Sequence, residues 1–110
     1  MKFTAPKGTR DLLPPETAAW QQAEQVFADV CSRFNYREIR LPTFEQTGLF
    51  QRGVGDTTDI VQKEMYTFPD KSGRSLTLRP EGTAGVVRSY IENGMASWPS
   101  PVRLYYLITA

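Results

Sequence analysis

The sequence predicts an α+β fold built around an antiparallel sheet. One long run of apolar residues before position 35 has the three- and four-residue spacing of a helix face. Further along, two alternating segments flank a turn that contains glycine, which is the pattern of a β-hairpin. The expected order is helix, strand, hairpin, helix and strand, in which antiparallel signals dominate.

The first helix is expected to begin after the two prolines at positions 14 and 15, whose fixed φ suits a helix start. Glu16 then lies near the positive end of the helix dipole, and Asn35 is a residue type that commonly ends a helix. Just before this helix, Arg10 and Asp11 are expected to form a surface ion pair in a loop. The apolar face of the helix consists of Trp20, Ala23, Phe27, Val30, Cys31 and Phe34.

The remaining elements are short, and proline, glycine or asparagine separates them. In chain order we expect a strand over 36–41 ended by Pro42, a short helix over 46–52, a loop over 53–59, strands over 65–68 and 75–79 joined by a turn, a helix from Pro80 to Asn93, and a strand over 102–109. The last strand ends with the chain, so the pattern fits either the edge of a short domain or a piece of a larger fold.

Composition narrows the possible functions. The 110 residues suit one domain, and 13 basic against 12 acidic residues give no electrostatic signature of nucleic-acid binding by this chain alone. Because the chain has no histidine and a single cysteine, we expect no metal site, no Ser-His-Asp triad and no internal disulfide. We see no signal peptide and no apolar run of about 20 residues, so the expectation is a cytoplasmic protein with no membrane span.

The candidate site lies where the helix after Pro80 is expected to start. Its first turn contains Gly82 and Gly85, each of which costs up to about 1 kcal/mol relative to alanine in a helix interior. Missing side chains let a ligand approach closely, and the Glu81 carboxylate and Thr83 hydroxyl can accept hydrogen bonds from a primary ammonium. This chemistry suits the α-amino group of an amino acid.

Two structural alternatives stay open for these residues. Glu81 can simply compensate the helix dipole, which contributes about 0.3–1 kcal/mol. Gly82 and Gly85 can equally serve tight packing against the neighbouring strand.

Several blocks of the sequence together resemble the histidyl-tRNA synthetase family. The segment TLRPEGTAGVVR at 77–88 resembles the signature of the second substrate site in that family. The blocks at 7–16, 36–45, 55–80 and 102–107 match the same family in the same order, so the resemblance covers nearly the whole chain.

This resemblance implies the N-terminal part of a class II aminoacyl-tRNA synthetase catalytic domain, an antiparallel sheet flanked by helices. Residues 16–45 would form motif 1 at a homodimer interface, with Pro42 as its proline. In the amino-acid-binding segment, Glu81, Gly82 and Thr83 would bind the amino end of histidine. For residues 57–61 we expect a structured loop, and Arg79 either holds Glu81 or faces a phosphate.

The resemblance also implies an activity for the parent protein. It would be a histidine–tRNA ligase that activates histidine with ATP and Mg²⁺ and then charges its cognate tRNA. The chain ends before the arginines of motifs 2 and 3, so no catalytic residue is expected within it and the chain alone is expected to be inactive.

Two other functions remain open. The regulatory subunit of ATP phosphoribosyltransferase resembles these synthetases over the same region, but its segment matching 80–83 tends to carry an aspartate and a bulkier residue. The intact Glu81-Gly82-Thr83 therefore favours the ligase. A non-catalytic dimerisation or interaction module that keeps only the motif 1 surface is the other alternative.

Overall fold

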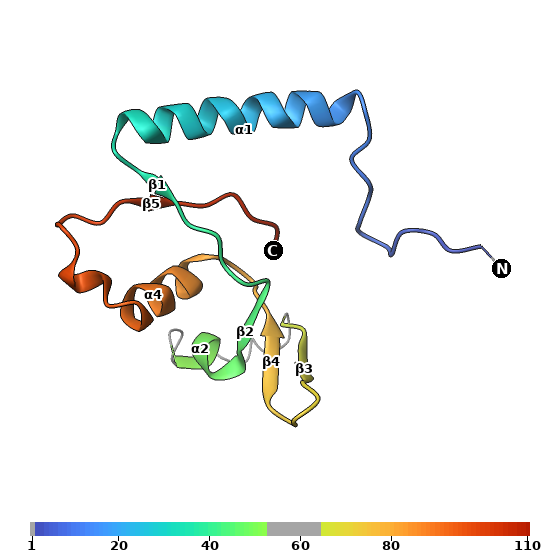
Figure 1. The fold of residues 1–110 in the computed structure, drawn as a ribbon. Helices are drawn as coiled ribbons and strands as arrows, with labels where there is room; N and C mark the ends of the chain where they lie inside the picture. The colour runs from blue at the N-terminus through green and yellow to red at the C-terminus, as the bar shows by residue number, and fades with distance from the viewer. Residues whose placement is uncertain (1, 53–64) are drawn as a thin grey trace. The chain divides into compact units, whose positions relative to one another are not determined.

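The computed structural model describes residues 2–52 and 65–110, and the chain forms two compact units, Met1–Asn35 and Tyr36–Ala110. Figure 1 traces both units along the chain. The expected loop at 53–59 and the 57–61 block lie outside the described residues. Among the helices of the described part, none is both long and apolar enough to cross a bilayer.

The first unit contains the predicted long helix, α1 (Glu16–Arg33), which begins directly after Pro15. Its end is also as predicted, because Asn35 adopts a left-handed φ of 64° that terminates the helix. The expected ion pair of Arg10 with Asp11 is wrong. Arg10 instead binds both carboxylate oxygens of Glu16, at 2.8 and 3.1 Å, because its planar fork matches that carboxylate.

The apolar face of α1 is present, and the first unit by itself does not bury it, since the helix contains no buried residue. Trp20 is 49% exposed and Phe34 is 65% exposed. A helix with an open apolar face gains little from the hydrophobic effect until another surface covers that face.

The second unit contains a three-stranded antiparallel sheet with the order β2-β4-β3. Its strands are β2 (Phe44–Gln46), β3 (Thr67–Pro69) and β4 (Ser75–Leu78). The predicted hairpin is confirmed as the β3–β4 pair. Strand β2 was not predicted, because its buried position is the charged residue Glu45 and the apolar alternation that signals a strand is lacking. The helix expected over 46–52 follows it as α2 (Thr47–Arg52).

Hydroxyl groups join the strands of this sheet at its centre. Thr77 on the middle strand is fully buried, and its Oγ1 lies 2.9 Å from that of Thr67 and 2.9 Å from that of Thr47. The Thr47 hydroxyl continues the chain to Ser75 at 2.7 Å. This satisfies the buried hydroxyl, which an apolar environment would otherwise penalise.

The same unit has a second sheet of two parallel strands, β1 (Arg37–Glu38) and β5 (Leu104–Tyr105), which lie side by side in Figure 1. Both are shorter than expected, although Ile39 still donates to the Tyr105 carbonyl at 2.9 Å. The antiparallel expectation does not hold for this pair. A parallel pair needs a long crossover, and the chain between these strands supplies one by forming the other sheet and the helix α4 (Thr83–Glu92).

Helix α4 ends as predicted, with Asn93 at its C-cap and Gly94 at a φ of 62°. A short 3₁₀ helix, η2 (Met95–Ser97), follows and buries Met95. On the side of α4 that faces β2, Arg88 binds the buried Glu45 carboxylate. This ion pair fixes the helix to the sheet and so positions the N-terminus of α4.

The β3–β4 turn is organised by one carboxylate. Asp70 accepts hydrogen bonds from the backbone N–H groups of Ser72 and Arg74, both at 2.8 Å, and from Nε of Arg74 at 2.9 Å. The backbone N–H of Arg74, more than any other group, holds the pKa of the Asp70 carboxyl below its usual value.

This depressed pKa predicts a pH dependence for the hairpin. A carboxyl whose pKa is lowered by folding stabilises the fold above its unfolded pKa, about 3.9, and that contribution disappears as the pH falls through the folded value. We therefore expect Asp70→Asn to destabilise the chain near neutral pH, and the difference from the wild type to shrink below about pH 4. Urea unfolding of the wild type and of Asp70→Asn, from neutral pH to below about pH 4, measures this difference in stability. A difference that does not change with pH would contradict the assignment.

Candidate functional site

The candidate residues lie where α4 begins, but not all are inside the helix. The helix was expected to start at Pro80, which would place Glu81 in its first turn; this start is wrong, because Gly82 is the N-cap and the helix begins at Thr83. Glu81 folds back onto this start, and its carboxylate accepts hydrogen bonds from the backbone N–H groups of Thr83 and Ala84. It therefore satisfies donors that a helix start leaves unpaired, as the dipole alternative requires.

This capping role leaves the Glu81 carboxylate with unused acceptor capacity. Two carboxylate oxygens offer about four acceptor positions, and the backbone of α4 supplies two donors. Glu81 and Thr83 are both exposed. A ligand with N–H donors can therefore reach both side chains from solvent.

The two glycines are buried against side chains of the same unit. A Cβ built on Gly82 would lie 2.5 and 2.6 Å from ring carbons of Tyr106 and 2.9 Å from Cδ1 of Ile108. A Cβ on Gly85 would lie 3.1 Å from Oε2 of Glu45. The packing alternative therefore explains why both positions lack a side chain, and Gly82 does not itself face an open site.

Tyr106 is the residue that sequence reasoning missed. Its hydroxyl lies 3.4 Å from Oγ1 of Thr83, so the second unit brings Glu81, Thr83 and Tyr106 together as three exposed or half-buried oxygen-bearing side chains. We call these three residues the helix-start cluster. The alternating pattern of 102–109 marked Tyr106 only as a strand residue and carried no sign of its neighbour.

Arg79 fits neither of the two expected roles. Its Nε donates to the Thr109 carbonyl at 2.8 Å, and its Nη1 donates to the carbonyls of Leu41 and Pro42 at 3.1 and 3.2 Å. Arg79 thus joins three separate chain segments through backbone oxygens. Pro42, the predicted interface residue, accepts one of these bonds and so is held beside the end of β4.

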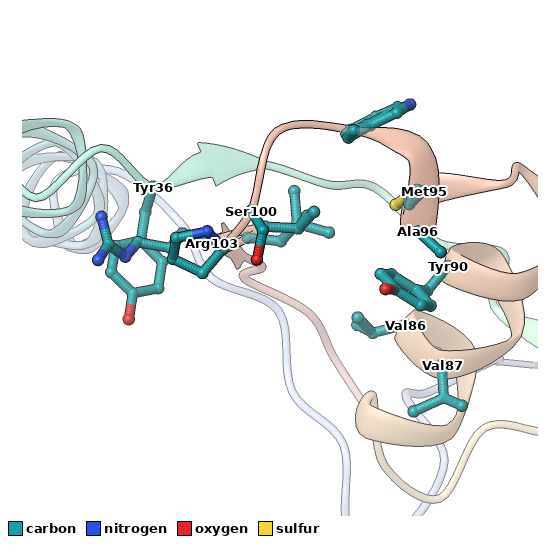
Figure 2. Close-up of a pocket in the computed structure, with 12 residues that line it drawn as sticks. Tyr36, Val86, Val87, Tyr90, Met95, Ala96, Ser100 and Arg103 are labelled. Atoms are coloured by element: carbon teal, nitrogen blue, oxygen red, sulfur yellow. The ribbon is translucent and has the colours of Figure 1, made fainter.

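A groove of about 530 Å³ lies elsewhere in this unit (Figure 2). In the figure, Val86, Val87 and Tyr90 of α4 lie on one side of it, and Tyr36 and Arg103 lie on the other. None of the three residues of the helix-start cluster lines it. Its walls are largely apolar and give no convergent set of polar groups that would define a ligand.

Within residues 2–52 and 65–110, no group of three or more histidine, cysteine, aspartate or glutamate side chains is placed to hold a metal ion.

Solved structures similar to this chain define its class. The apo histidyl-tRNA synthetase of S. aureus matches with a TM-score of 0.83 and 47% identity, over 96% of this chain and 24% of that chain. An ATP phosphoribosyltransferase regulatory subunit/histidyl-tRNA synthetase from Bacillus halodurans matches less well, with a TM-score of 0.75 and 26% identity. The mixed helices and antiparallel sheet are part of a class II aminoacyl-tRNA synthetase catalytic domain.

Sequence comparison narrows this class to a family. The family model described as histidyl-tRNA synthetase matches residues 8–109. The chain belongs to the histidyl-tRNA synthetase family. The histidine–tRNA ligase of Acetivibrio thermocellus is 72% identical over 110 residues, which is all of this chain and 26% of that protein. That of Caldicellulosiruptor saccharolyticus is 64% identical over the same length. The chain thus spans about a quarter of the curated relatives it matches.

Proposed function

We propose that this chain provides the histidine-binding half of the active site of a histidine–tRNA ligase. The whole protein would activate histidine with ATP and Mg²⁺ to form histidyl-adenylate and would then esterify the terminal adenosine of its cognate tRNA. The 47% identity to a histidyl-tRNA synthetase, against 26% to the structure titled as a regulatory subunit/synthetase, favours this function over the regulatory alternative.

The observation that carries the proposal is the pair of exposed acceptors at the start of α4. Glu81 is held by two backbone N–H groups and keeps acceptor positions open, and the Thr83 hydroxyl lies one residue into the helix. The α-ammonium of histidine would donate to both, and the Glu81 charge would offset the unfavourable positive end of the helix dipole. Gly82 takes part through its backbone, because its side-chain position is filled by Tyr106.

Holding the amino end fixes where the rest of the amino acid lies. The carboxylate of histidine, attached to the same carbon, is then directed away from Glu81 by like-charge repulsion. It is this carboxylate that attacks the α-phosphate of ATP and releases pyrophosphate. The contribution of this chain is therefore to orient the nucleophile.

We also propose that the whole protein is a cytoplasmic homodimer formed through residues 16–45, including Pro42. The support is the apolar face of α1, which the first unit by itself leaves exposed and which another surface would bury with a gain of about 25 cal/mol per Å². Sedimentation velocity of the chain tests this point, and a strictly monomeric chain would contradict a self-sufficient interface.

The function is tested by two-dimensional amide NMR of the labelled chain with histidine, with proline as the control ligand. We expect dispersed peaks and histidine-specific shifts at the amides of residues 81–83. A dispersed spectrum that is indifferent to histidine would favour the interaction module instead. Collapsed peaks would contradict a preformed half-site in this chain.

A further inference from the structure

Histidine binding through Glu81 and Thr83 leaves the direction of the Thr83 hydroxyl proton unassigned. A threonine hydroxyl has one donor and two acceptor positions and rotates freely unless a neighbour fixes it. An incoming ammonium has only donors, so a Thr83 proton that points toward it would oppose binding. Some group must draw that proton away.

The Tyr106 hydroxyl is placed to do this. It lies 3.4 Å from Oγ1 of Thr83, and either oxygen can be the donor. When Thr83 donates to Tyr106, both acceptor positions of the Thr83 oxygen are free for the ligand. The distance is longer than the roughly 2.5–3.0 Å of a well-formed hydrogen bond between hydroxyls, and it is expected to shorten as the ammonium polarises the pair.

The ring of Tyr106 is itself held in place from two sides. Gly82 lacks a side chain at the point where a Cβ would meet ring carbons at 2.5 and 2.6 Å, so the ring lies directly against the backbone of the N-cap. Arg79 donates to the Thr109 carbonyl at 2.8 Å and also to the carbonyls of Leu41 and Pro42. These three hydrogen bonds of Arg79 keep the segment that carries Tyr106 beside residues 79–83.

We propose that Tyr106 is a positioning residue that accepts a hydrogen bond from the Thr83 hydroxyl and so leaves the Thr83 oxygen free to accept from the α-ammonium of the substrate, with Arg79 holding its segment in register. The inference rests on the proposed function of the helix-start cluster. In this inference Gly82 lacks a side chain so that the tyrosine ring can lie against its backbone. Arg79 holds the segment of Tyr106 in place, and binds neither Glu81 nor a phosphate.

The test compares Tyr106→Phe with the wild-type chain by NMR titration at the amides of residues 81–83. Phenylalanine keeps the ring against Gly82 and removes only the hydroxyl, so we expect the free energy of unfolding to stay unchanged. The dissociation constant for histidine should rise about two- to tenfold, as for one lost hydrogen bond. Histidinol, which keeps the amine but lacks the carboxylate, should lose affinity by the same factor.

The controls separate this role from general effects. Tyr66→Phe removes a hydroxyl from a side chain that is 75% exposed, and should leave both affinities unchanged. N-acetylhistidine, whose amine is blocked, should shift neither protein. An unchanged affinity for histidine in Tyr106→Phe, or a loss seen with histidine but not histidinol, would overturn the inference.

A failure of the inference is distinct from a failure of the proposed function. If the wild-type chain does not respond to histidine, the proposed function fails and the inference fails with it. If the wild type responds and Tyr106→Phe responds equally well, the function stands and only the role of Tyr106 is wrong. Arg79→Lys is a second variant, which keeps the positive charge but lacks the several N–H donors of the guanidinium group, so it should weaken histidine binding. Arg74→Lys is its control, because Arg74 lies in the β3–β4 turn and pairs with Asp70, and it should leave histidine binding unchanged.

Discussion

Replacing Arg88 by methionine is expected to lower the free energy of unfolding by about 3 kcal/mol, the lower end of the cost of breaking a buried ion pair on one side, because Arg88 is itself 26% exposed. Glu45 is only 8% exposed, and Arg88 binds both of its oxygens, through Nε at 3.1 Å and Nη2 at 3.0 Å. Methionine fills similar space but leaves the carboxylate without its cation. The hydrogen bonds that Arg88 donates to the Glu45 carboxylate are also the main cause of the raised pKa of Arg88.

Urea unfolding of the variant measures this loss, and the chain offers a matched control. Arg88 also binds Glu92 at 2.9 Å, but Glu92 is 66% exposed. Glu92→Gln should therefore cost only about 0.3–0.5 kcal/mol, as for other exposed pairs one helical turn apart. A double variant, Glu45→Met with Arg88→Met, should recover most of the loss because it leaves no unpaired charge. Equal effects of Arg88→Met and Glu92→Gln would contradict a buried pair at this position.

This ion pair also shows why part of the fold escaped sequence reasoning. The periodic apolar face predicted α1, and the turn residues predicted the hairpin, because both signals depend on neighbours along the chain. Strand β2 instead depends on a partner on another element, since the buried residue of β2 is Glu45 and Arg88 of α4 neutralises it. A buried charge is the opposite of a strand signal, and only the folded chain supplies its compensation.

Only part of the candidate site could likewise be predicted from the sequence. Glu81 and Thr83 carry acceptors that any amine site needs, so residue chemistry was enough to select them. Tyr106 and Arg79 make their contacts with distant segments, since Tyr106 lies against Gly82 and Arg79 reaches Leu41 and Thr109. No local spacing encodes such contacts. The parallel β1–β5 pair escaped for the same reason, because two short strands far apart in sequence carry no mark of their relative direction.

Gly82→Ala is expected to damage the site more than any other single methyl group added to it. The new Cβ would lie 2.5 Å from a ring carbon of Tyr106 and 2.9 Å from Ile108, so the ring has to move. Overpacking of this kind typically costs about 1–3 kcal/mol of stability. The displaced ring also withdraws its hydroxyl from Thr83, and we expect the dissociation constant for histidine to rise about tenfold, equivalent to about 1.4 kcal/mol. Urea unfolding and NMR titration measure the two effects.

Two further variants test whether the clash with the Tyr106 ring causes the losses expected in Gly82→Ala. Gly48→Ala adds the same methyl group to α2 where nothing lies within 4 Å, so it should be neutral or slightly stabilising. In the double variant with Tyr106→Ala, the added methyl group no longer meets a ring, so the loss should be smaller than the sum of the two single losses. Additive losses would mean that the added methyl group acts through another neighbour, such as Ile108 at 2.9 Å, whereas strong coupling ties the glycine at the helix start to the Tyr106 ring.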